Sequence, residues 1–182
     1  MGIEENELRP LVDDWRNANH KITRFWADIE RAAIATVETG VARVVRGITF
    51  TLNENHLTIL LPSGRPLYYP QVELQPNKWG HPSITFMGVG ASRKYQRLTT
   101  YGGKLVENIT QAVARDLLAH ALTTVTTAGH TIVMHIHDEI VIETPHNTPI
   151  TTVCDLMSNT PPWAKGLPIT ADGYECNYYK KD

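Results

Sequence analysis

The chain has 182 residues, of which 42% are hydrophobic and 20% charged, and its formal net charge is −2. This composition predicts a soluble globular chain with enough apolar material for one ordinary domain or two small ones. The near-neutral charge excludes general electrostatic attraction to nucleic acid, so any nucleic-acid surface has to be a local patch. Two cysteines without a CxxC pair argue against a disulfide scaffold and favour a reducing cytoplasm. No apolar run has the roughly 18 residues that a membrane span needs.

Two amphipathic helices are predicted at the N-terminus. Helical spacing first connects four large apolar residues: Leu8, Leu11, Val12 and Trp15. The segment "NANH" (17–20) ends this helix, and a second apolar stripe runs from Ile22 to Val37 and stops at Gly40. We expect the aromatic side chains of both helices to pack in the core.

The middle of the sequence is rich in β-forming residues. From Ile48 to Leu74, apolar runs alternate with the turn signals "NENH" and "PSGR", which predicts several short strands. "PNKWGHP" (76–82) reads as a loop, and "SITFMGVG" (83–90) as one more strand.

The longest helix is predicted from Gly103 to Thr127. Its apolar stripe contains residues spaced mainly by four: Leu105, Val106, Ile109, Val113, Leu117, Ala121, Leu122 and Val125. On another face, polar side chains follow one another at spacings of 4, 3 and 4: Lys104, Asn108, Gln111 and Arg115. The pattern alone is compatible with a solvated face or with a binding edge.

An acidic pair lies within the last apolar region. "HTIVMHIH" and "IVIET" flank Asp138 and Glu139, which predicts two strands joined by an Asp138–Glu139 turn. At a hairpin tip these carboxylates avoid burial, which would cost several kcal/mol each without partners. A short helix is predicted over 148–159 with Thr148 as N-cap, followed by a loop and a final strand over 169–179. Together these elements predict an α+β fold.

Three interpretations of the acidic hairpin remain open from its residues alone. It can be an ordinary hairpin with a charged turn. It can be a transition-metal site, because His135 and His137 would share one face of a regular strand. It can also hold a divalent metal against a phosphate, since hard cations such as Mg²⁺ prefer oxygen ligands.

The surrounding motifs resemble the C-terminal part of family A DNA polymerases, the DNA polymerase I type, and in particular their bacteriophage branch. They are "TYGGKLVENITQAVARDLLAHAL", "MHIHDEIVIETP", "LPSGRPLYYP" and the closing "LPITADGYECNYYKK". The resemblance covers almost the whole chain. It implies the end of the fingers region at 1–97 and the C-terminal half of the palm at 98–182. It also implies a long helix packed on an antiparallel palm-type sheet with a central β-hairpin.

The resemblance also implies roles for the acidic hairpin. Asp138 would ligate the catalytic Mg²⁺ of the complete enzyme, with Glu139 beside it as a support or an occasional ligand. His137 would approach the backbone of the primer terminus. The partners would be a DNA primer-template and deoxynucleoside triphosphates, with no membrane, in the cytoplasm of a bacterial host that carries the phage or prophage.

The polar stripe of the long helix would face DNA. Gln111 would contact template or primer from the minor-groove side, and Lys104 and Arg115 lie on the same helix face. Asn108 belongs to this face too. Glu107, however, stands where the family commonly has Asn, four residues before that glutamine.

Other family motifs are absent from the sequence. There is no D-Y-S-x-x-E string for the second palm carboxylate and no R-x-x-x-K-x-x-x-F-G-x-x-Y-G fingers helix. "SRKYQRLTTYGG" (92–103) imitates the end of the fingers motif, but Arg97 stands where Phe is required, so we reject the match. The resemblance therefore implies a missing N-terminal polymerase part as partner and predicts that this chain is inactive alone. The alternative is a non-catalytic DNA-binding or interaction remnant.

Overall fold

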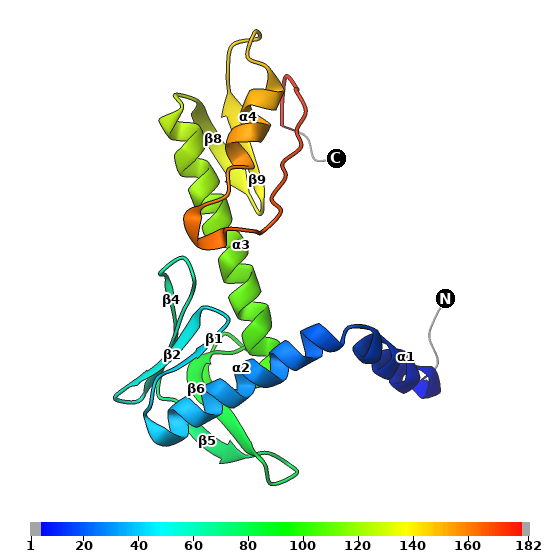
Figure 1. Ribbon diagram of the computed structural model, residues 1–182, viewed down its shortest axis with the longest axis vertical. Coiled ribbons are helices and arrows are strands. Elements are labelled where there is room, and N and C mark those ends of the chain that lie inside the picture. Colours follow the sequence, from blue (N-terminus) through cyan, green and yellow to red (C-terminus); the bar gives the residue numbers. More distant parts are fainter. Residues whose placement is uncertain (1–4, 180–182) are drawn as a thin grey trace. The chain divides into compact units, whose positions relative to one another are not determined.

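The computed structural model describes residues 5–179, with side chains from residue 7 onward, and divides into two compact units after Thr110 (Figure 1). The fold is α+β, as predicted. The helices are α1 (Glu5–Ala18), α2 (His20–Thr39), α3 (Gly102–Thr127), α4 (Ile150–Met157) and the 3₁₀ turn η1 (Pro162–Ala164). The strands are β1 (Arg43–Val45), β2 (Ile48–Asn53), β3 (His56–Leu60), β4 (Pro66–Tyr69), β5 (Glu73–Pro76), β6 (Pro82–Val89), β7 (Tyr95–Thr100), β8 (Thr131–Ile136) and β9 (Glu139–Glu143). Within residues 5–179, no helix is both long and apolar enough to cross a membrane.

The two N-terminal helices form where the sequence predicts them. A single residue, Asn19, separates α1 from α2. At the other end of α2, Gly40 adopts φ 71° and its N–H donates to the Thr36 carbonyl at 2.9 Å. This left-handed cap costs a glycine little, so Gly40 ends the helix as predicted.

The predicted burial of Trp15 in the first helix is wrong. Ile29 and Ala33 of α2 are fully buried, but the apolar residues of α1 and the first apolar residue of α2 are exposed. The exposed set is Leu8, Leu11, Val12, Trp15 and Ile22. Periodicity predicts an apolar face but not what covers it, and nothing in the described chain buries this one.

The first unit is built on a four-stranded antiparallel sheet in the order β1-β2-β3-β4. Phe50 of β2 pairs with Ile59 of β3, and both side chains are fully buried. Alternate residues on each strand point inward, as the two-residue period of a strand requires. Helix α2 packs on β1, β2 and β3 as well as on β5 and β6, so its buried face joins two sheets.

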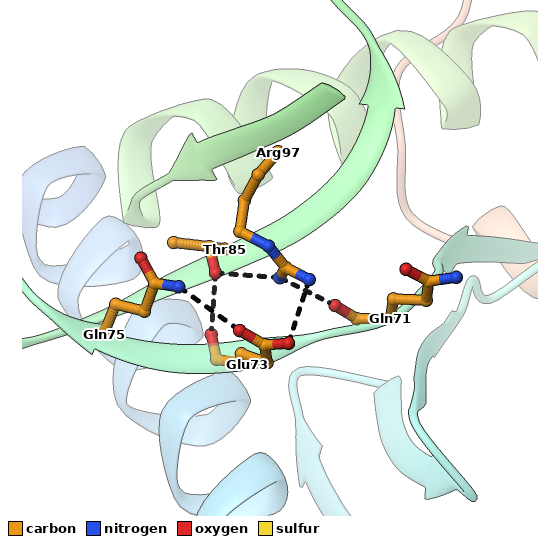
Figure 2. A network of polar contacts seen from close by, with 5 residues as sticks. All are labelled: Gln71, Glu73, Gln75, Thr85 and Arg97. Atoms are coloured by element: carbon orange, nitrogen blue, oxygen red, sulfur yellow. Dashed lines mark hydrogen bonds and ion pairs between the residues drawn. The ribbon is translucent and has the colours of Figure 1, made fainter. Parts of the chain in front are cut away.

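The second sheet of this unit has the order β5-β6-β7 and is also antiparallel. Strand β7 is not among the predicted elements; Tyr95–Thr100 is a strand and not part of a fingers helix, in agreement with the rejected motif match. Arg97 of β7 donates to the Gln71 carbonyl at 2.9 Å, to Thr85 Oγ1 at 3.2 Å and to Glu73 Oε1 at 2.9 Å (Figure 2). The arginine therefore ties together the chain entering β5, β5 itself and β6.

The long helix α3 begins at Gly102, one residue before the predicted Gly103. A Cβ on Gly102 would lie 2.2 Å from the carbonyl oxygen of Trp26, so only glycine allows α3 to approach the α2 backbone this closely. Most of the predicted apolar stripe is buried: Leu105, Val106, Ile109, Ala121 and Val125.

The second unit contains the rest of α3, the β8–β9 hairpin, α4 and a C-terminal segment. Two predictions fail here. The N-cap of α4 is Pro149 rather than Thr148, whose hydroxyl instead accepts a hydrogen bond from Thr144 at 2.7 Å. The predicted final strand over 169–179 is irregular, because no strand pairs with it in the described chain.

Candidate functional site

The acidic hairpin forms, but its turn lies one residue earlier than predicted. Ile136 pairs with Glu139, which leaves His137 and Asp138 as the two turn residues. Ile132 pairs with Ile142 and Met134 with Val141, so Val133 is an extra, bulged residue in β8. A bulge changes the pairing register between its two sides. Because Ile136 pairs with Glu139, the predicted Asp138–Glu139 turn is wrong, and Glu139 is the first residue of β9.

The turn holds His137 in a left-handed conformation with φ 50°. Two-residue hairpin turns need positive φ at their first position and favour asparagine, aspartate or glycine there. A non-glycine residue in this region costs of the order of 1–3 kcal/mol. Within residues 5–179, four other non-glycine residues share this conformation, so it is not specific to the acidic hairpin: Arg46, Glu54, Gln71 and Arg93. His137, Asp138 and Glu139 are all exposed, so the prediction that the carboxylates escape burial is confirmed.

The two histidines do not form the predicted strand pair. β8 ends at Ile136, so His135 lies in the strand and His137 in the turn. The prediction that they share one face assumed a regular strand through His137 and is wrong. Within residues 5–179, no group of three or more histidine, cysteine, aspartate or glutamate residues could hold a metal ion.

Glu139 has a partner that the sequence analysis missed. The hydroxyl of Tyr179 donates to Glu139 Oε2 at 3.2 Å, so the C-terminal segment meets the acidic hairpin. Desolvation raises the pKa of Tyr179, and the negative charge of Glu139 raises it further. The phenol therefore stays neutral and keeps its proton for the carboxylate. The aromatic pair Tyr178-Tyr179 was the only sequence signal for this contact.

The polar stripe of α3 is partly used within the chain. The ammonium group of Lys104 lies 2.9 Å from both carboxylate oxygens of Glu107, and this hydrogen bond raises the pKa of Lys104. Glu107 is the residue that departs from the family pattern, and it offsets the charge of the lysine beside it. Both side chains remain exposed to solvent.

Asn108 is half-buried and stabilises the packing of α3 on β4. Its Nδ2 donates to the hydroxyl of Tyr69 at 3.0 Å, which connects α3 to β4. Burial raises the pKa of Tyr69, while the hydrogen bond from Asn108 and the charge of Lys104 act in the opposite direction. Tyr69 also packs edge-on against Phe86 of β6, with ring centroids 4.9 Å apart.

The other two stripe residues belong to the second unit. Gln111 and Arg115 are exposed on α3. Of the four predicted DNA-facing residues, Lys104 and Asn108 thus interact with named side chains of the first unit. Arg115 carries the stripe's other positive charge.

Comparison with known proteins shows which kind of protein this chain is similar to. The chain is similar over its whole length to part of a DNA polymerase. That polymerase comes from Bacillus phage SP02: 47% of residues are identical over 186 aligned positions, which cover 100% of this chain and 28% of the polymerase. The chain thus corresponds to part of a phage DNA polymerase, and the resemblance found in the sequence is confirmed at that level. No protein-family model matches the sequence, and no solved structure matches the fold.

Proposed function

We propose that this chain is part of a family A DNA-directed DNA polymerase and supplies one of its metal-binding carboxylates, Asp138. The observation that carries the proposal is the 47% identity to a phage DNA polymerase over the whole chain. The hairpin supports it physically, because a tight turn presents Asp138 at the end of a paired ribbon with little positional freedom.

The donor set of the hairpin fits Mg²⁺ as an incomplete site. Asp138 and Glu139 are adjacent, exposed carboxylates, and Mg²⁺ is usually bound through one or two carboxylates together with substrate phosphates and water. A bound Mg²⁺ would neutralise developing charge on the transferred phosphoryl group. Asp138 would be the primary ligand, and the Tyr179 hydroxyl would hold Glu139 beside it.

The remaining residues would position DNA. His137 stands next to Asp138 in the turn, where its imidazole would contact the backbone of the primer terminus. Gln111 and Arg115 would contact primer-template from α3, and Lys104 would do so after releasing Glu107. Asn108 would act indirectly, by fixing the first turns of α3 against Tyr69.

The proposal includes inactivity of the chain alone. Phosphoryl transfer depends on positioning and on metals held by several ligands, and the described residues hold no group of three or more metal-binding side chains. The second carboxylate and the nucleotide-binding fingers residues would come from the rest of the polymerase.

The direct experiment compares two proteins in a primer-extension assay. One is the 182-residue chain alone, and the other is SP02 polymerase in which this chain replaces the matching segment. We expect no incorporation by the first and template-directed incorporation by the second. Extension by the isolated chain, free of contaminating polymerase, would contradict the proposed inactivity. A folded, DNA-binding chimera that incorporates no nucleotide would contradict the polymerase assignment.

A further inference from the structure

Helix α1 carries an apolar face that the described chain leaves uncovered. We call Leu8, Leu11, Val12 and Trp15 the α1 stripe. Their exposed fractions are 48%, 51%, 43% and 47%, and no residue of α1 from Glu7 to Ala18 is buried. Spacing of three and four residues places all four side chains on one side of the helix. A row of four half-exposed large apolar side chains on one helix face is a candidate packing surface.

On the opposite side of α1, charged side chains pair with one another within the helix. Arg9 bonds Asp13 at 3.1 Å, and Arg16 lies 3.9 Å from the other oxygen of Asp13. The stripe is also held in place, because the Trp15 ring stacks on Trp26 of α2 with centroids 5.8 Å apart. Unpaired packing surface is therefore confined to the stripe side of α1.

Helix α1 needs a partner to be stable. Isolated helices shorter than about 12–15 residues are marginal in water, and most helices in proteins are stabilised by packing an apolar face. α1 has 14 residues and buries none of its described side chains in this chain. Apart from the Trp15–Trp26 stack, the α1 stripe is open to a packing partner.

The area of the α1 stripe indicates whether a separate molecule or another segment of the same polypeptide can cover it. A 14-residue helix is about 21 Å long, so one face about 10 Å wide offers on the order of 200 Å². A stable complex between separate molecules buries about 800 Å² on each side, because association must overcome lost translational and rotational freedom. A segment of the same polypeptide avoids that cost. The matching polymerase has such a segment available, since this chain spans only 28% of it.

We infer that the α1 stripe is the surface on which the rest of the polymerase chain packs. This inference rests on the proposed function, since it takes its partner from the longer polymerase. The partner surface is apolar, because it has to cover the exposed faces of Leu8, Leu11 and Val12.

The test is hydrogen exchange of α1 in two contexts, the isolated chain and the SP02 chimera. We expect amides in residues 7–18 to exchange at least tenfold more slowly in the chimera. Leu11→Asp should return fast exchange to α1 in the chimera and leave the melting temperature of the isolated chain unchanged. The matched control is Asn17→Asp, which adds the same charge to the opposite, exposed face of α1 and should preserve protection.

Several outcomes would overturn the inference. Equal exchange of α1 in the two wild-type proteins would do so whether or not the Leu11→Asp chimera folds. Concentration-dependent protection in the isolated chain, abolished by Leu11→Asp, would identify a second copy as the partner instead. Protection of α1 in an inactive chimera would contradict the proposed function but not the docking surface. An active chimera in which α1 is not protected would contradict the docking surface but not the proposed function.

Discussion

Asn108 donates a hydrogen bond to the hydroxyl of the buried Tyr69 at 3.0 Å, and this contact fastens the beginning of α3 to the four-stranded sheet. Tyr69 in turn packs edge-on against Phe86 of the three-stranded sheet. One tyrosine therefore connects a helix and two sheets. A residue that family resemblance assigns to DNA thus has a structural task in the protein itself.

Removing either partner of this bond should destabilise the isolated chain. We expect Tyr69→Phe and Asn108→Ala each to lower the free energy of unfolding by about 1 kcal/mol, because a neutral hydrogen bond contributes about that much. In a double-mutant cycle the two losses should be less than additive. Urea unfolding followed by circular dichroism measures both, with the exposed neighbour Tyr68→Phe as control. Strict additivity would show that the bond contributes nothing.

The same tyrosine should make stability depend on alkaline pH. Burial raises the pKa of Tyr69 above its ordinary value of 10.0, so the unfolded chain loses this proton first as pH rises. The stabilising contribution of the neutral phenol is complete below about pH 10 and declines as pH rises toward the folded-state pKa. The stability difference between wild type and Tyr69→Phe should therefore shrink as pH rises above about 10. A difference that stays constant or grows would contradict this assignment.

The close crossing of α2 and α3 should not tolerate a side chain. Gly102→Ala would place a Cβ 2.2 Å from the backbone oxygen of Trp26, so the two helices would have to separate. We expect a loss of about 2–3 kcal/mol in unfolding free energy. Gly103→Ala is the matched control, since its nearest neighbour at 3.2 Å is the side chain of Tyr101, which can move. Equal effects of the two variants on thermal unfolding would refute the close-contact explanation.

Glu107 should weaken DNA binding by occupying Lys104. Glu107→Gln removes the carboxylate that bonds the ammonium group, so Lys104 becomes available to a phosphate. We expect tighter binding of the isolated chain to primer-template DNA and a log–log salt slope steeper by about 0.9. Fluorescence anisotropy at several salt concentrations measures this. Glu38→Gln makes the same change in net charge at another exposed position. If both variants shift the slope equally, only net charge matters; adding Lys104→Ala to Glu107→Gln should reverse the effect.

Local signals predicted much of the fold. Gly40 ends α2 because only a left-handed residue fits there, and the Gly102-Gly103 pair marks the beginning of α3 because of the helix crossing. The loop at 76–82 and the strands on either side of it follow from turn residues and alternation. These features depend on neighbouring residues, so a single sequence contains them.

The failed predictions depend on partners that are distant in the sequence. The hairpin turn lies at His137–Asp138 instead of Asp138–Glu139 and β8 has a bulge at Val133, and no local pattern marks either feature. The partners of Glu139 and Asn108 lie 40 and 39 residues away. The exposure of Trp15 depends on which elements pack against α1, and amphipathicity cannot reveal these. The domain boundary and the site roles taken from family resemblance stay predictions.

We propose that Asp138 holds the catalytic metal, and the nucleotide incorporation rate of the SP02 chimera with Asp138→Asn at saturating Mg²⁺ tests this role most directly. Asn keeps the size of the side chain and removes its charge, so the rate should fall on the order of a thousandfold, equivalent to about 4 kcal/mol of barrier. Because Asp138 is exposed in a turn, circular dichroism and DNA affinity of the same sample should be unchanged. Glu143→Gln, at the far end of β9, should keep the wild-type rate. A folded Asp138→Asn chimera that retains more than about a tenth of the wild-type rate would contradict the assignment.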